Sequence, residues 1–568
     1  MSETMDAVEA QVRPLPDAET AGDAALGLGR AAGALAATGL LAACGGGDSG
    51  SGPAGGGGTP APPPPPPPTA TQASRLLAQA TMGATRASID GVVTRGITGW
   101  VDDQLATPRA GSHWQWLVDN GYAVVANRDG TTGFDPTMWR TLITAPDQLR
   151  QRVGMALLDI LAVGIDGINL SWRQFAMAAY VDVLLDNAFG NFRTLMEAMT
   201  TNAAMASFVT FLGNRKARNG AVPDENYARE ILQLFTIGLY QLEMDGTVRL
   251  VNGRPVETYT QADVAGLARV FTGLSLANSN NETPDRYRMP LVMNAGINET
   301  GTANFLGTST TGGGMAAVQA ALDTIFAHPN VPPFISKQLI QRLVTSNPTP
   351  AYVARIANVF ANNGNGVRGD LKAVVRAILL DTDARSDAAI TANGFGKLRE
   401  PVMRLTGWAR AFGVNSPTNA WAIGDTSSQS TRLGQSFGRS PTVFNFFRPG
   451  YTPPNTAIAT AGLVAPEFQI TNEQSVVGYV NYMNSLVANG AGDTKADYTA
   501  ILTKAADAAA LVDEINLVLA AGQLSAATVT AIRTAVESVS ATATNGPINR
   551  VGIAILLTLA SPDFLTVR

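Results

Sequence analysis

The stretch TAPDQLRQRVGMALLDI, residues 144–160, decides the fold class of this chain. Its third and fourth residues, Pro146 and Asp147, are of types that are common at the start of a helix. Apolar residues then recur with the 3.6-residue period of a half-buried helix, namely Leu149, Val153, Ala156, Leu157 and Ile160. The segment therefore predicts a helix that buries one face against a core.

The same pattern continues to residue 568. Further helix starts with apolar faces follow at Pro332-Pro333, Thr349-Pro350 and Asp370. Alanine-rich segments near residues 480–490, 500–520 and 526–540 predict further helices. The sequence from residue 71 to residue 568 therefore predicts a mainly α fold, a large multi-helix globular body of one unit or of two packed lobes.

Strand signals are few. Asp245-Gly246 lies between the apolar runs 239–242 and 248–251, which predicts one small β-hairpin. Two stretches, 278–314 and 415–439, lack periodicity altogether. Structureless runs of this length are usually functional loops or disorder.

The front of the chain carries an export signal. Residues 31–43 are apolar and small, follow Arg30, and are too short for a membrane span of about 20 residues. They end in Leu41-Ala42-Ala43-Cys44, which resembles the bacterial lipobox. That resemblance implies a signal segment at residues 1–43, cleavage before Cys44 and lipidation of its thiol. The alternative is a free cysteine in a disordered tail, and the long, acidic start of the segment departs from the usual pattern.

Residues 44–70 are rich in glycine and serine and then carry seven prolines, Pro62 to Pro68. Such a composition does not fold, so we expect a disordered lipoprotein stalk that holds the body off a membrane. Gly45 after the cysteine resembles lipoproteins sorted to the outer membrane. We therefore expect an exported, lipid-anchored protein at the outer membrane, facing the periplasm or the cell surface.

Composition excludes several classes of function. The net charge is −5 and no run of lysine or arginine occurs, so we expect no nucleic-acid partner. The single cysteine excludes an internal disulfide and a cysteine metal site. His113 and His328 are not at ligand spacing, and no G-x-S-x-G turn accompanies them. We expect neither a metal nor a cofactor.

The densest polar cluster is PDENYARE, residues 223–230, which runs into an apolar helix ending at Gly238. Glu225 with Arg229, and Asn226 with Glu230, stand at i,i+4 spacing. One hypothesis is a paired-carboxylate site with Arg229 as a buried clamp, because Ala228 and Leu232 leave little polar face. The other is a helix start with acids in the first turn and a favourable ion pair.

Other candidate residues have simple structural explanations. Asp263 is a further catalytic candidate, but its spacing from Thr260 is that of a capping box. His328 precedes a helix, where a hydrogen-bonded turn histidine is expected. Lys397, Arg399 and Glu400 before Pro401 indicate a helix start with buried ion pairing.

The proline-bounded segment SPTVFNFFRP, residues 440–449, is rich in aromatic residues. It predicts either a recognition surface or aromatic side chains that plug the core. Its Phe444, Asn445 and Arg448, together with Asn226, are the candidate binding residues.

Several blocks together resemble the bacterial family known only as domain of unknown function 1800, over residues 71–568. The blocks lie at residues 75–83, 146–153, 223–238, 259–273, 328–348, 395–401, 440–447 and 561–565. The resemblance implies export and no known activity. It also implies a partner, because the family is often encoded beside domain of unknown function 1501, which looks like an alkaline-phosphatase or sulfatase relative. Asn298 and Ala303 depart from the family, where many relatives carry His and Lys.

Two functions follow from these observations. The first is a non-enzymatic accessory or binding protein of the envelope or periplasm, which works with a secreted partner. The alternative is a carboxylate-based secreted hydrolase that uses Glu225, Glu230 and Asp263, with Arg229 as the residue that orients them.

Overall fold

Helices of the kind expected for residues 144–160 make up most of the structure. The computed structural model describes residues 66–568, and helices hold about 52% of the chain. The predicted signal segment, the lipidation site Cys44 and nearly all of the predicted stalk lie outside the described residues. The described residues 66–568 form one compact unit, in which the first helix begins at Ala70.

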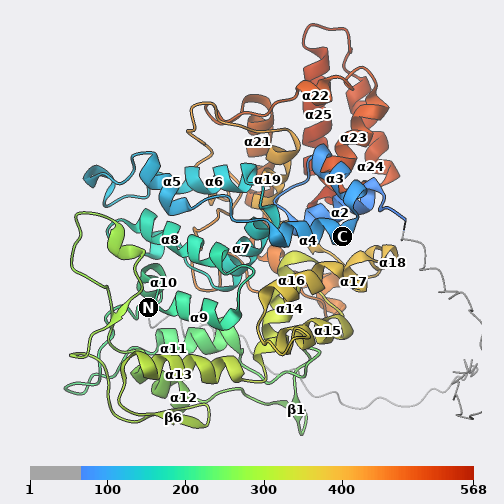
Figure 1. Ribbon diagram of the computed structural model, residues 1–568. Coiled ribbons are helices and arrows are strands. Elements are labelled where there is room, and N and C mark those ends of the chain that lie inside the picture. Colours follow the sequence, from blue (N-terminus) through green and yellow to red (C-terminus); the bar gives the residue numbers. More distant parts are fainter. Residues whose placement is uncertain (1–65) are drawn as a thin grey trace, which may run out of the picture. The chain divides into compact units, whose positions relative to one another are not determined.

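The first half of this unit is a series of short helices joined by both short and long loops (Figure 1). They are α2 (Ala70–Ala80), α3 (Arg86–Arg95), α4 (Ile97–Ala106), α5 (His113–Asp119), α6 (Phe134–Thr144), α7 (Gln148–Ile160), α8 (Arg173–Asp186), α9 (Phe192–Thr200), α10 (Ala203–Phe208), α11 (Asn226–Glu230), the π-helix η3 (Ile231–Thr236) and α12 (Gln261–Val270). Short 3₁₀ turns lie at η1 (Val125–Asn127), η2 (Ile165–Gly167) and η4 (Asp285–Tyr287).

The second half continues in the same way. It contains α13 (Gly314–Ala327), α14 (Val331–Leu343), α15 (Pro350–Ala361), α16 (Leu371–Leu380), α17 (Thr382–Arg385), α18 (Asp387–Ile390), α19 (Pro401–Ala411), α20 (Ala457–Thr460), the 3₁₀ turn η5 (Pro466–Ile470), α21 (Glu473–Asn489), α22 (Thr499–Leu502), α23 (Ala508–Ala520), α24 (Ala526–Glu537), α25 (Gly546–Ala560) and α26 (Pro562–Leu565). The helices α23, α24 and α25 pack on one another, and α21 packs on α25 (Figure 1).

Side-chain caps explain where several helices begin. The Thr349 hydroxyl accepts a hydrogen bond from the backbone N–H of Tyr352 at 3.1 Å, and α15 starts at the next residue. The Asp370 carboxylate accepts one from the N–H of Ala373 at 3.1 Å, at the start of α16. These bonds satisfy N–H groups that have no partner inside the helix. The helix starts predicted at Thr349 and Asp370 are confirmed.

The strands form four separate antiparallel pairs within residues 66–568. They are β1 (Leu250–Val251) with β2 (Arg254–Pro255), β3 (Leu274–Ser275) with β4 (Val292–Met293), β5 (Ala303–Phe305) with β6 (Thr308–Thr310), and β7 (Lys397–Leu398) with β8 (Thr566–Val567). The predicted turn at Asp245-Gly246 closes a bridge between Leu242 and Val248. The hairpin predicted there is thus present as an isolated bridge. None of the four strand pairs was predicted, because each strand is only two or three residues long and carries no usable period.

The two stretches without periodicity differ from each other. Residues 278–314 contain β4, the β5–β6 hairpin and the turn η4. Residues 415–439 form no helix or strand, yet Leu433 and Phe437 are buried in the core. Both stretches are therefore ordered parts of the body rather than disordered loops.

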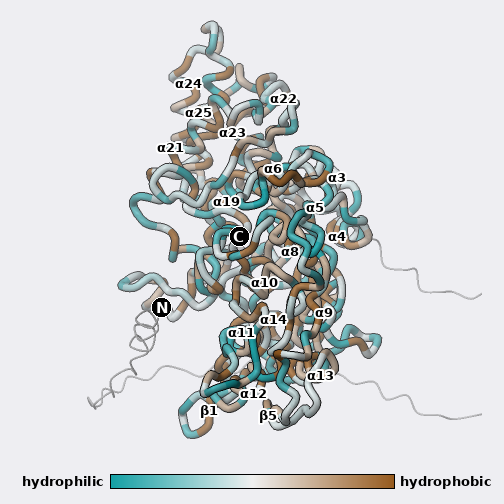
Figure 2. Tube along the Cα trace, turned by 90° about the vertical axis from the view of Figure 1, so that its left-hand side faces the viewer, coloured by the Kyte–Doolittle hydropathy of each residue, from teal (hydrophilic) through white to brown (hydrophobic). Residues whose placement is uncertain are grey.

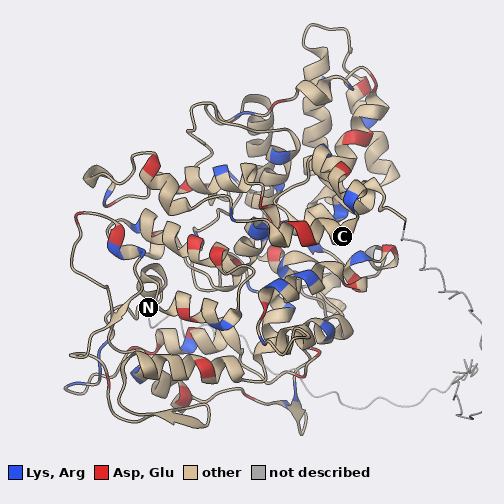
Figure 3. Ribbon diagram, in the orientation of Figure 1, with Lys and Arg blue, Asp and Glu red and all other residues tan. Residues whose placement is uncertain are grey.

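One continuous hydrophobic cluster runs from Ala73 in α2 to Phe564 in α26. Hydrophobic and hydrophilic residues alternate along the helices that surround it (Figure 2). Charges of both signs are interspersed over the described part of the chain (Figure 3). Of the helices in residues 66–568, none combines the length and the apolar character that crossing a bilayer requires.

The helix α7 is buried more completely than its sequence suggests. It contacts α4, α8 and α14, so neighbours cover it on several sides (Figure 1). Besides its apolar stripe, Gln151, Arg152 and Asp159 are also buried. The helix was predicted correctly, but the prediction that only one of its faces is buried is wrong. The polar residues of α7 need partners inside the protein, and those partners form the most elaborate polar site of the body.

Candidate functional site

The segment 223–238 folds as a short α-helix followed by a π-helix. Tyr227 in α11 anchors it, with its ring stacked on Phe211 at 4.1 Å between centroids and its hydroxyl 2.6 Å from that of Thr200. The π-turns of η3 replace the continuous α-helix that the sequence predicts. The wider turn shifts the buried face, so that Leu232 is buried and Leu234 is only partly covered.

Glu225 and Arg229 pair at the surface. The distance from Arg229 Nη2 to Glu225 Oε2 is 3.3 Å, and Gln261 Nε2 donates to the same carboxylate oxygen at 2.7 Å. The Arg229 side chain is 34% exposed. The expectation that Arg229 is a buried clamp is therefore wrong: Gln261 from α12 completes a solvated network around it. Asn226 does not bond Glu230; its Nδ2 donates to Thr210 Oγ1 at 3.2 Å instead.

Glu230 differs from its neighbours because it is buried without a hydrogen-bonded or ion-paired partner among residues 66–568. Burial raises the pKa of Glu230 to about 7, and the charge of Arg229 only partly opposes that rise. The residue stands at the junction of α11 and η3. A carboxyl group in this state is protonated about half of the time near neutral pH.

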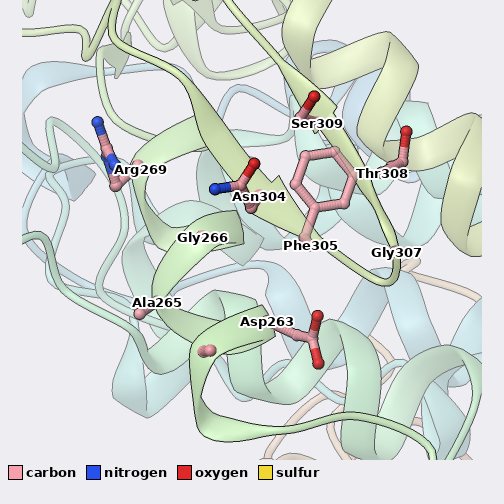
Figure 4. Close-up of a pocket in the computed structure, with 10 residues that line it drawn as sticks. Asp263, Ala265, Gly266, Arg269, Asn304, Phe305, Gly307, Thr308 and Ser309 are labelled. Carbon is pink, nitrogen blue, oxygen red and sulfur yellow. The ribbon is translucent and has the colours of Figure 1, made fainter.

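Asp263 caps the helix α12. Its carboxylate accepts from the backbone N–H and the hydroxyl of Thr260, both at 2.7 Å, and from the N–H of Leu306 at 2.6 Å. The capping box expected at this position is confirmed. The third bond ties the start of α12 to the turn of the β5–β6 hairpin (Figure 4).

An open hollow of about 760 Å³ lies where α12 meets the β5–β6 hairpin. Figure 4 shows Asp263 at one end of it, directed toward the hairpin turn, and Arg269 at the other. The hairpin backbone lies directly on the helix: a Cβ built on Gly266 would stand 1.7 Å from the carbonyl oxygen of Asn304. Only glycine permits that approach.

Asn298 and Ala303, the two positions expected to depart from the family pattern, lie near and in this hairpin and have structural roles. Asn298 is 2% exposed. Its Nδ2 donates to the carbonyl of Thr272, and its Oδ1 accepts from the N–H of Gly314, both at 2.7 Å. Ala303 is buried in β5 opposite Thr310. An amide and a methyl group provide no proton-transfer or nucleophilic group here.

Both histidines are built into the fold. The backbone N–H of Asn330 donates to His328 Nδ1 at 3.1 Å, which confirms the hydrogen-bonded turn histidine. His113 is fully buried, with Nδ1 3.1 Å from the hydroxyl of Thr137. Burial lowers the pKa of His113 to about 3, so the ring is neutral at physiological pH.

The polar side chains that converge most densely do so around the start of α19. Lys397 Nζ lies 3.0 Å from Glu467 Oε1 and 3.5 Å from Glu400 Oε1, and it donates to the carbonyl of Arg342 at 2.9 Å. Gln435 Nε2 donates to the other oxygen of Glu400 at 2.8 Å. The side chains of Lys397, Glu400 and Glu467 are each less than 5% exposed. The buried ion pairing predicted for Lys397 and Glu400 is confirmed.

We call the whole set the ionic cluster. Its cations are Arg152, Arg342, Lys397, Arg399 and Arg404, and its carboxylates are Asp159, Glu400 and Glu467; every one of them is buried. Burial alone raises the pKa of Glu400, but the charges of Lys397 and Arg152 outweigh it and hold that pKa below the ordinary value. Burial and the charge of Glu400 raise the pKa of Asp159 to about 7.

The segment 440–449 covers one side of the ionic cluster. Asn445 Nδ2 donates a close hydrogen bond to Asp159 Oδ1, and the Phe447 ring lies 4.8 Å from the guanidinium carbon of Arg342. Phe444 and Arg448 stack on each other at 4.6 Å on the outer side, and Arg448 is exposed. The segment therefore plugs the core with one set of side chains and presents the other set to solvent.

Sequence reasoning missed most of the ionic cluster. Arg152 and Asp159 lie in α7, Arg342 in α14 and Glu467 in η5, so no local spacing joins them. The available signal was the presence of charged residues, Arg152 and Asp159 among them, on the apolar helix of residues 148–160. Among the His, Cys, Asp and Glu residues of the described chain, no group of three is arranged to hold a metal ion.

Comparison with known proteins gives a family but no function. The model of the family described as protein of unknown function (DUF1800) matches residues 75–566. The chain belongs to this family. The match includes every residue of the ionic cluster and the whole of the 223–238 segment. No curated protein and no solved structure matches the chain.

Proposed function

We propose that this protein is an exported, lipid-anchored binding protein of the bacterial envelope that assists a secreted partner and is not itself an enzyme. The arrangement of the three candidate carboxylates carries this proposal. Glu225 is in a surface ion pair and Asp263 caps a helix, while Glu230 has neither a hydrogen bond nor an ion pair to another described residue. Acid–base hydrolysis needs two groups placed on either side of the reacting bond.

The proposed location rests on the lipobox-like end of the signal segment at Cys44 and on the stalk that follows it. Two or three acyl chains hold a protein stably on a bilayer, because each buried methylene contributes roughly 0.8 kcal/mol. We place the body at the outer membrane, facing the periplasm or the cell surface.

Labelling with radioactive palmitate tests the anchor. The wild-type protein should incorporate label and fractionate with membranes, and Cys44→Ser should do neither. Ser49→Ala, a change of similar size in the same stretch, should behave as wild type. A wild-type protein that takes up no label would refute the lipid anchor.

The proposed partner is a phosphatase- or sulfatase-like protein of the domain of unknown function 1501 family. Phe444 and Arg448 supply an aromatic and cationic contact of the kind found in protein interfaces. Affinity purification of the lipidated protein from an envelope extract should recover this partner. Arg448→Ala should reduce its recovery, whereas Arg218→Ala, at another exposed arginine, should not.

A secreted hydrolase is the second candidate, and Glu230 favours it. A carboxyl group with a pKa of about 7 is suited to general acid or base catalysis near neutral pH. If this alternative holds, chromogenic esters or glycosides are hydrolysed with a pH profile that turns near 7. Glu230→Gln then abolishes turnover, and Glu225→Gln does not. Absence of hydrolysis by the wild-type protein removes this candidate.

A further inference from the structure

A second, mainly apolar cavity lies beside the ionic cluster. It has a volume of about 230 Å³ between α19, α21 and the end of the chain. Its apolar walls include Leu433, Ile470, Val480 and Leu565. For comparison, a dry cavity of about 150 Å³ accommodates a benzene ring. The space therefore suits a ring or a short alkyl chain together with one small polar group.

Arg404 is the one charged residue that lines this cavity. It is 6% exposed; its Nε donates to the carbonyl of Arg399 at 2.8 Å, and its guanidinium carbon lies 4.8 Å from the Tyr479 ring centroid. No described residue accepts a hydrogen bond from Nη1 or Nη2 of Arg404. These nitrogens are not among the fully enclosed, unpartnered atoms of the described residues. Because Arg404 lines the cavity, they are the donors that a ligand there could reach.

The other polar groups of the wall already have partners. The Tyr479 hydroxyl donates to the carbonyl of Leu559 at 3.0 Å, and the Thr471 hydroxyl to the carbonyl of Glu467 at 3.2 Å. The Ser475 hydroxyl donates to the carbonyl of Asn472 at 3.0 Å. Arg404 is thus the lining residue that has donors to offer a ligand.

The charge balance of the ionic cluster points to an anion. Five cations stand against three carboxylates, and an excess of buried positive charge is costly unless it is paired. At Arg404 itself, Glu400 and Glu467 offset part of this positive charge, so a ligand with one negative charge balances the guanidinium better than a ligand with two. A planar guanidinium fits a carboxylate well.

We propose that this cavity binds a small monocarboxylate with a short apolar body, and that Arg404 pairs with its carboxylate. The ligand enters beside Val476 and Pro562, which line the cavity and are exposed. This inference deepens the proposed binding function by naming a class of ligand. It depends on neither the lipid anchor nor the partner.

Isothermal titration of the full chain carrying Cys44→Ser tests the proposal. The probes are phenylacetate and hexanoate, which represent aromatic and aliphatic bodies. Phenylacetamide removes the charge at nearly constant shape, and phenyl phosphate adds a second charge. We expect at least one monocarboxylate to bind about tenfold more tightly than phenylacetamide and phenyl phosphate. Equal binding of phenylacetate and phenylacetamide, or no binding of either acid, overturns the proposal.

Variants locate the binding site. Arg404→Met keeps the length of the side chain without its charge and should weaken carboxylate binding about tenfold or more. Arg432→Met is the matched control, because Arg432 packs on Tyr482 outside this cavity and should leave binding unchanged. Val480→Phe fills the cavity while keeping Arg404, so it should also abolish binding. If Arg404→Met does not fold, Val480→Phe decides, and unchanged affinity in that variant refutes the site.

The experiments distinguish a wrong ligand assignment from a wrong proposed function. Palmitate labelling and recovery of the partner do not involve the cavity. A protein that is lipidated and partnered but binds no carboxylate loses only the ligand assignment. A protein that binds carboxylate without lipidation loses only its location.

Discussion

The ion pair of Glu225 with Arg229 and the ion pairs of the ionic cluster use similar residue types but differ in their exposure to solvent. In the first region Arg229 lies in the short helix α11, Glu225 directly precedes that helix, and solvent reaches both. In the second, Lys397, Glu400 and Glu467 come from different elements and are almost fully enclosed. Spacing along one helix reveals the first kind of pair. The pair of Lys397 with Glu467 exists only after distant segments have packed together.

The largest expected effect is in the ionic cluster. Lys397→Met should lower the free energy of unfolding by about 3–5 kcal/mol, because Glu467 and Glu400 then lose a buried partner. Urea denaturation measures this change. Arg86→Met, which breaks exposed pairs, should cost no more than about 1 kcal/mol. Equal losses in the two variants would contradict the contrast between the regions. The double variant Lys397→Met/Glu467→Gln should recover part of the stability.

The next effect concerns pH and Asp159. Its pKa of about 7 in the folded protein exceeds the ordinary value of about 3.9, so the folded state holds the proton more tightly than the unfolded state. Its contribution to stability is therefore full in acid, falls as pH rises from about 4 to about 7, and is constant above. The free energy of unfolding should therefore fall between pH 5.5 and pH 8, and Asp159→Asn should remove this part of the pH dependence.

Comparison of that variant with wild type at each pH is essential, because His113 acts in the opposite direction. Its pKa of about 3 in the folded protein lies below the ordinary value, so its contribution is lost as pH falls through the range from about 6.5 to about 3. The difference between the Asp159→Asn and wild-type curves cancels that effect. A difference that does not vary with pH would show that Asp159 is ionised throughout.

A smaller pH effect is expected from Glu230 in the first region. Because the pKa of Glu230 is raised to about 7, its contribution to stability also falls as pH rises, as that of Asp159 does. Glu230→Gln should stabilise the protein at pH 8 by about 1 kcal/mol, less than the full shift implies because part of the group is accessible to solvent. Thermal unfolding at pH 5.5 and pH 8 measures it. A Glu230→Gln protein that is less stable at pH 8 would contradict the raised pKa.

The smallest effect is expected at Arg229. Its removal breaks a partly solvated network with Glu225 and Gln261, so Arg229→Ala should cost no more than about 1 kcal/mol. The result is measured by urea denaturation alongside Lys397→Met. If Arg229→Ala lowered the free energy of unfolding by about 3 kcal/mol or more, Arg229 would be a buried partner after all, and the two regions would not differ.

Local patterns predicted local structure well. The mainly helical class, the caps at Thr349 and Asp370, the capping box at Asp263 and the turn at His328 all follow from residues within a few positions of one another. The family membership is also confirmed. Each of these depends on backbone groups that a nearby side chain can reach.

Long-range relations were beyond the sequence. Arg229 contacts Gln261 from α12, and Asp159 is covered by the loop that contains Asn445. Both contacts join segments that are far apart in the sequence. The π-turns of η3 change which side chains of this segment face the core. The spacing of the apolar residues in the sequence does not reveal that change. The roles of the candidate catalytic and binding residues, the lipid anchor and the partner stay predictions.

The pairing of β7 with β8 has a consequence for how the protein is made. Lys397 lies opposite Val567, so the strand that carries the central lysine has no partner until residue 567 has been synthesised. The β7–β8 pair is therefore the last strand pair that can form as the chain grows. Until then, the backbone of the strand that carries Lys397 has no strand partner.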